Sequence, residues 1–297
     1  MDREKNLTSV TLWGAIANLA LSALKMTAGI FGSSSAMVAD AVHSLSDLVS
    51  DALVLVMVKV SSRKQDKGHD YGHGKFETLA TVFMSILLLV VGARLLVGAI
   101  EKIKLVAQGG TLASPGIIAF VAALVSIAVK EFMYQWTARV GKKHDSPMIV
   151  ANAWHHRSDA LSSVGSAAGI GFAILLGGKW TILDPIVGCI ISVVIMVVAV
   201  KMTIPAIGEL TEASLPEDVE ENIVRIIESV PGVDNTHALK TRRIGPDIII
   251  DSHIVVNPDM TVVRAHDIST AVEEALRREY GAGTQISIHI EPNEGAD

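Results

Sequence analysis

Six apolar runs occupy most of the first part of the chain, and they constrain its fold more than any other feature. A helix needs about 20 apolar residues to cross the roughly 30 Å hydrocarbon core of a membrane. We therefore expect an α-helical membrane protein with six transmembrane helices. The predicted spans are Val10–Phe31, Ala36–Val60, Leu79–Ile103, Gly116–Trp136, Ile149–Leu176 and Ile182–Ile207.

The distribution of Lys and Arg between the connecting segments predicts the orientation of these spans in a lipid membrane, because positive residues favour the cytoplasmic side. The first connection has no charge, and the fifth has only Lys179. We expect both termini in the cytoplasm, with the protein in a prokaryotic inner membrane. The positive residues lie in the second connection (Arg63, Lys64, Lys67, Lys75) and the fourth (Arg139, Lys142, Lys143).

The composition changes near Glu209 to a charged pattern typical of a soluble domain. We expect a transmembrane domain over residues 1–208 and a cytoplasmic domain over residues 209–297. Helical spacing of apolar residues, alternating segments and Gly-Pro turns predict an α-β-β-α-β order, an α+β sandwich of ferredoxin-like or metallochaperone-like type. Its predicted elements are Glu217–Ser229, Thr236–Arg243, Asp247–Val256, Val263–Tyr280 and Gln285–Ile290.

Several classes of function are disfavoured by composition and by missing motifs. A net charge of -6 argues against a nucleic-acid partner, which requires a basic surface. The one cysteine, Cys189, allows neither an internal disulfide nor a thiolate cluster. The chain has no Walker A motif and no His-Glu-x-x-His motif, so an ATP-driven pump and a metallohydrolase are disfavoured. We expect a protein that is not an enzyme.

The strongest functional signal is a matched pair of His-x-x-x-Asp motifs inside the second and fifth spans. They are His43 with Asp47, and His155 with Asp159. Residues four apart share one face of a helix. Because ionisable groups are rare within membrane spans, such pairs indicate a functional site. The other interpretation is that they only hydrogen-bond the helices together.

The two motifs reach the same depth in antiparallel helices. At 1.5 Å per residue, Asp47 and Asp159 lie roughly 15 Å from the cytoplasmic boundary. Two imidazoles and two carboxylates could then form a tetrahedral site, which suits Zn²⁺. These groups release protons when they bind metal. Among the neighbouring residues, Asp40 and Asp51 are weaker candidates for a place in this site. His156 points away from the helix face that His155 and Asp159 share.

These motifs resemble those of the cation diffusion facilitator family of metal/proton antiporters. The resemblance extends over essentially the whole chain. It implies six spans, a homodimer formed through the C-terminal domain, and transport of a divalent metal ion at His43, Asp47, His155 and Asp159. Where this chain has His43 the family often has Asp, and its zinc-selective members commonly combine two His with two Asp. The resemblance also admits Fe²⁺, Mn²⁺, Cd²⁺ or Co²⁺.

The same resemblance implies two further groups of metal ligands. One lies in the second connection, where two histidines four apart and a carboxylate can form a three-ligand site; the alternative is a solvated polar loop. The other lies in the C-terminal domain, where a glutamate stands in place of a common aspartate. The first group is Asp66, His69 and His73, and the second is His237, His253, His266, His289 and Glu291.

The predicted function is efflux of a divalent transition metal, with zinc favoured, in exchange for protons. An iron or manganese carrier of the same architecture is the alternative within transport. A non-transporting metal sensor or assembly scaffold is the alternative from another class.

Overall fold

The computed structural model describes residues 2–31, 35–110, 117–176 and 183–293. Inside some helices the description covers the backbone but not every side chain, and His43 and Asp40 are among these residues. The first connection and Lys179, on which the predicted orientation partly rests, lie outside the described residues. The chain forms two compact units, residues 1–206 and 207–297.

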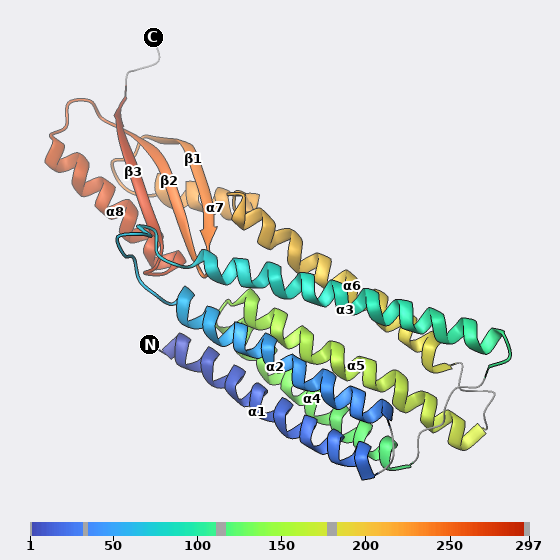
Figure 1. Ribbon diagram of the computed structural model, residues 1–297. Helices are drawn as coiled ribbons and strands as arrows, with labels where there is room; N and C mark the ends of the chain where they lie inside the picture. Colours follow the sequence, from blue (N-terminus) through green and yellow to red (C-terminus); the bar gives the residue numbers. More distant parts are fainter. Residues whose placement is uncertain (1, 32–34, 111–116, 177–182, 294–297) are drawn as a thin grey trace. The chain divides into compact units, whose positions relative to one another are not determined.

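The first unit is made of long helices, α1 to α6, drawn from blue to yellow in Figure 1. Each has between 27 and 33 residues, or about 40 to 50 Å at 1.5 Å per residue. Most begin or end outside the predicted apolar spans, because polar residues extend the helix beyond its apolar stretch. The helices are α1 (Asp2–Phe31), α2 (Ser35–Ser61), α3 (Lys75–Ala107), α4 (Ile117–Lys143), α5 (Pro147–Leu176) and α6 (Leu183–Leu210).

Three stretches within the described residues are long and apolar enough to cross a membrane by length and composition. They are Arg3–Thr27, Lys75–Ala107 and Ser192–Leu210. Helices α2, α4 and α5 are of similar length, but parts of them lie outside the residues whose side chains are described. A helical membrane domain is therefore present, and the number of six spans stays a prediction.

Helices α1, α2, α4 and α5 pack closely against one another. A buried apolar cluster that includes Leu7 and Val58 joins several helices of the first unit. Helices α3 and α6 run alongside each other (Figure 1), and Thr203 donates a hydrogen bond to Ser85 between them at 2.8 Å. At Gly92 of α3 a Cβ atom would come within 2.8 Å of the Met196 side chain, so a glycine permits this close approach.

A buried ion pair defines one end of this helical unit. Arg3 of α1 donates hydrogen bonds to both carboxylate oxygens of Glu77 at 3.1 and 2.9 Å, and one to the backbone carbonyl of His144 at 3.0 Å. Glu77 lies in the first turn of α3, and His144 follows α4. The beginnings of α1, α3 and α5 and the ends of α2 and α4 therefore meet here. The later turns of α6 lie beside the first half of α3, where Thr203 contacts Ser85.

The second unit has the predicted α-β-β-α-β order. Its three-stranded sheet has the order β1-β2-β3, with β1 antiparallel and β3 parallel to the central strand β2. The elements are α7 (Glu217–Glu228), β1 (Asn235–Ile244), β2 (Asp247–Val256), α8 (Val262–Tyr280) and β3 (Gln285–Pro292).

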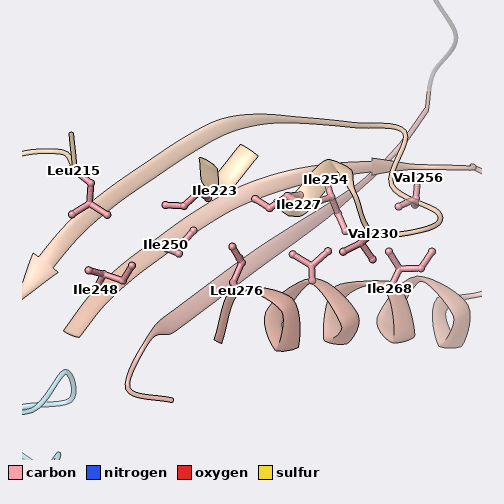
Figure 2. Packing of buried hydrophobic residues seen from close by; sticks show 11 residues of the cluster. Leu215, Ile223, Ile227, Val230, Ile248, Ile250, Ile254, Val256, Ile268 and Leu276 are labelled. Atoms are coloured by element: carbon pink, nitrogen blue, oxygen red, sulfur yellow. The ribbon is translucent and has the colours of Figure 1, made fainter. Parts of the chain in front are cut away.

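The core of this unit lies between the sheet and the helices α7 and α8. Figure 2 shows Ile268 and Leu276 of α8 directed toward Ile250 and Ile254 of β2. Alternate residues of a strand point to opposite faces of the sheet. The even-numbered residues of β2 are therefore buried against the helices, and His253 lies on the opposite, partly exposed face. This alternation places the histidines of the sheet on the face that solvent reaches.

Candidate metal sites

Side chains from α2 and α5 meet deep in the helical unit. One carboxylate oxygen each from Asp47 and Asp159 and one ring nitrogen of His155 lie within 4.8 Å of one another. His155 Nε2 is 3.4 Å from Asp47 Oδ1. Asp47 and His155 are each 3% exposed, so this group of donors is shielded from solvent. Three donors at this separation have the chemistry of a metal site with a remaining ligand position.

The helical spacing of the sequence produces this geometry. His155 and Asp159 are four residues apart on α5, so they share a face one above the other. Asp47 comes from α2, which packs against α5. His43 lies one turn before Asp47 on the same helix, but its side chain lies outside the described part of the structure. Its predicted place as the fourth ligand stays a prediction.

A buried lysine from α4 contacts both carboxylates, and sequence reasoning missed it. Lys130 Nζ donates hydrogen bonds to Asp159 Oδ2 at 2.8 Å and to Asp47 Oδ2 at 3.2 Å. The lysine side chain is 1% exposed. Its ammonium balances negative charge that would otherwise be costly to bury. A metal ion that binds both carboxylates has to displace this ammonium or share the oxygens with it. The signal available in the sequence was a lysine near the middle of an apolar run.

The second predicted group gathers in the loop between α2 and α3. Asp66, His69 and His73 have donor atoms within 4.8 Å of one another. Asp66 Oδ1 is 3.4 Å from His69 Nδ1, and Asp66 Oδ2 is 3.5 Å from His73 Nε2. Hydrogen bonds from the backbone N–H groups of Gly68 and His69 hold the pKa of the Asp66 carboxyl below its usual value. The turn thus keeps this carboxylate ionised and directed toward both imidazoles.

The register of the sheet explains the third group. His237 of β1 is paired with His253 of β2, which in turn is paired with His289 of β3. Residues paired across neighbouring strands project from the same face. The sheet therefore presents a row of three histidines, and the ring centroids of His253 and His289 are 4.7 Å apart.

Glu291 completes this row because it lies two residues beyond His289 on the same face of β3. Its carboxylate oxygens lie 2.8 Å from His253 Nδ1, 3.1 Å from His237 Nε2 and 3.7 Å from His289 Nε2. His237, His253 and Glu291 have donor atoms close enough to hold one metal ion. His266 lies on α8 and is exposed; among the described residues of a single chain it does not join this group.

Comparisons with known proteins agree with this architecture. Residues 11–211 match the cation efflux transmembrane domain, and residues 215–293 match the cytoplasmic domain of cation efflux proteins. The chain is 35% identical over 290 residues to metal tolerance protein C1 of Arabidopsis thaliana, covering 94% of this chain and 61% of that longer protein. It therefore spans less than two thirds of the length of that relative.

Two bacterial relatives match the chain over nearly their whole length. The manganese efflux system protein MneP of Bacillus subtilis is 29% identical, over 98% of each chain. The magnetosome protein MamM of Paramagnetospirillum magneticum is 32% identical, over 96% of this chain and 88% of that protein. The two domain matches together cover most of the sequence. The chain therefore belongs to the cation diffusion facilitator family of divalent-metal efflux transporters, and it is a transporter rather than an enzyme.

Proposed function

We propose that this protein exports zinc from the cytoplasm in exchange for protons, through a transport site formed by Asp47, His155, Asp159 and His43. The observation that carries the proposal is the convergence of one imidazole and two carboxylates from α2 and α5 in a buried site. A second imidazole, from His43, would complete two nitrogen and two oxygen donors, a set that Zn²⁺ accepts in tetrahedral geometry.

Exchange with protons follows from the chemistry of these donors. Carboxylates and imidazoles bind metal only after losing their protons, so metal binding releases protons and metal departure allows them to return. Lys130 adds a resident positive charge to the same oxygens. Its ammonium would hold the carboxylates in place when the metal leaves, and it would disfavour very tight metal binding. Both effects suit a carrier, which has to release its cargo.

Manganese or iron is the alternative cargo, and the name of the Bacillus subtilis relative favours testing manganese first. The three described donors include two carboxylates, which also suit these harder ions. The imidazole of His155 favours zinc over manganese. The identity of the fourth ligand therefore decides between the two ions, and His43 is the residue to vary.

The second part of the proposal is that the histidine row of the sheet senses cytoplasmic metal. His237, His253 and Glu291 lie on the sheet face opposite the α7 and α8 core, where a cytoplasmic ion reaches them. Metal bound there would stabilise the homodimer formed by the cytoplasmic domain and favour the transport-competent population. The loop group around Asp66 would bind metal more weakly because Asp66 and His69 are exposed.

Transport assays of the purified chain in proteoliposomes test the proposal. Uptake of zinc, manganese, iron, cadmium and cobalt is compared for the wild type, Asp159→Asn and His43→Asp. We expect zinc transport in the wild type, its loss in Asp159→Asn, and a shift toward manganese in His43→Asp. If the wild type transported manganese alone, manganese rather than zinc would be the cargo. The absence of any metal flux by well-folded protein would favour the sensor or scaffold.

A further inference from the structure

A second polar cluster lies beside the transport site, and it involves none of the four ligands proposed for that site. Asp51 of α2 accepts hydrogen bonds from Asn18 Nδ2 of α1 at 2.8 Å and from Asn152 Nδ2 of α5 at 3.1 Å. His156 Nε2 lies 3.9 Å from Asp51 Oδ1. All four side chains are at most 1% exposed. Three helices thus direct a carboxylate, two amides and an imidazole to one buried point.

The hydrogen bonds within this cluster do not satisfy its members. Among the described residues, Asn152 Oδ1 and both ring nitrogens of His156 are buried without a hydrogen-bond partner. Buried polar atoms in folded proteins are nearly always paired, and leaving one unpaired is destabilising. A network that only joined helices would be expected to satisfy these atoms. A bound ligand would supply the partners that the protein's own groups do not provide for these atoms.

The unsatisfied atoms and the charge of the cluster point to a cation. Asp51 contributes a negative carboxylate that its two amide partners do not neutralise, while Asn152 Oδ1 and His156 Nε2 offer lone pairs when they are not protonated. Carboxylate, amide oxygen and imidazole are all ligands of divalent transition metals. Gly14 of α1 leaves room beside the imidazole, since a Cβ atom there would come within 3.3 Å of His156 Nε2.

In the orientation that the sequence predicts, the cluster lies on the cytoplasmic side of the transport site. Asp51 is one turn beyond Asp47 on α2, and Asn152 is about one turn before His155 on α5. Both are therefore displaced toward the helix ends that meet at Arg3 and Glu77, next to the basic second and fourth connections that the sequence predicts to be cytoplasmic. One turn corresponds to about 5.4 Å, and the rings of His155 and His156 have centroids 6.3 Å apart. An ion could move between the two sites in one short step.

We propose that Asn18, Asp51, Asn152 and His156 form a second divalent-metal site, an entry station that binds the ion before it reaches Asp47 and Asp159. This inference rests on the proposed transport function. The station would capture the ion with oxygen-rich, weaker ligation and pass it to the deeper site. An ion held at the station would also stay away from the Lys130 ammonium, which is hydrogen-bonded to the carboxylates of the transport site.

Two measurements on the full chain test the station. In the first, the transport site is removed by Asp47→Asn with Asp159→Asn, and zinc bound per chain is counted at equilibrium with and without the added change Asp51→Asn. The loop and tail groups are common to both proteins and cancel in the difference. We expect Asp51→Asn to remove one zinc ion per chain, and Ser50→Ala, a neighbouring buried change, to remove none. Equal zinc counts with and without Asp51→Asn would overturn the station.

In the second, zinc transport is measured in Asp51→Asn and in His156→Gln with the transport site intact. An entry station predicts that KM for zinc rises at least about tenfold while kcat falls less. A merely structural role would lower the active fraction and leave KM unchanged, and that result in both variants would overturn the inference. A wild-type protein that moves no metal would contradict the proposed transport function instead, so the two failures are distinguishable.

Discussion

Lys130 Nζ lies 2.8 Å from Asp159 Oδ2 and 3.2 Å from Asp47 Oδ2, at the centre of the proposed transport site. A buried ammonium between two carboxylates is a built-in competitor for any metal ion that needs the same oxygens. It also prevents two unpaired negative charges from being buried when the site holds no metal.

Removal of this ammonium should strengthen metal binding. We expect Lys130→Gln to lower the Kd for zinc by about tenfold or more, equivalent to about 1.4 kcal/mol, because the ion no longer displaces a cation. Turnover should fall, since release becomes slower. Equilibrium dialysis gives the Kd, and proteoliposome transport gives kcat. Lys201→Gln, an exposed change on α6, is the matched control; equal affinity in the wild type and Lys130→Gln would contradict the competition.

The buried ion pair at the end of the bundle should contribute measurably to stability. Arg3→Gln leaves Glu77, which is 1% exposed, without its bidentate partner. Breaking a buried pair in this way costs about 3 to 5 kcal/mol when both charges are fully buried, and somewhat less here because Arg3 is 27% exposed. The Tm in detergent should fall in Arg3→Gln and stay close to that of the wild type in Lys5→Gln. Equal Tm values for all three proteins would show that the pair adds no stability.

The histidine row makes a prediction about the ligands that a single chain supplies. We expect His253→Ala to weaken metal binding by the cytoplasmic domain of the full chain by at least about tenfold, and to weaken metal activation of transport. His266→Ala should change the affinity less than twofold, because His266 lies on α8 away from the row. An equal loss in His266→Ala would show that this residue reaches the metal from the partner in a dimer.

The Asp66 carboxyl has a lowered pKa, and this predicts a pH dependence for the loop group. A carboxylate with a lowered pKa stays ionised until the pH falls below the ordinary range for aspartate, near pH 3.9. Between about pH 7 and about pH 5 its contribution to metal binding should therefore be constant. The ratio of wild-type to Asp66→Asn affinity, measured by titration with zinc, should not change across this window. A ratio that approaches one at the acidic end would contradict the lowered pKa.

The ranges predicted from the sequence for the helices and strands of the cytoplasmic unit begin and end within two residues of the observed ones. Alternation in Asp247–Val256 and helical spacing in Val262–Tyr280 are local patterns, so they are readable without a structure. The family resemblance implied that the three histidines belong to one group of ligands, but their arrangement in a row was not predictable, because it depends on which residues of three strands are paired. A register shift between His237 and Lys240, with Ala238 at a positive φ of 51°, adjusts β1 within this pairing.

In the helical unit, the spacing of His155 and Asp159 predicted their shared face, and counting along the helices placed Asp47 at the same depth. Lys130 and Asn18 were missed for a different reason. Each is a single polar residue in a span that hydropathy alone describes as apolar, and only the packing of α1 and α4 against α2 and α5 gives it a partner. Contacts between helices are a tertiary property, which the periodicity of one segment does not contain.

The most direct test of the account is proton movement measured together with zinc transport. Proteoliposomes that contain a pH-sensitive dye are given an inward zinc gradient, with the wild type and Asp47→Asn reconstituted at equal density. We predict an immediate pH change driven by zinc in the wild type and none in Asp47→Asn. Zinc-driven proton movement that persists in Asp47→Asn would contradict the assignment of the transport site to Asp47, His155 and Asp159.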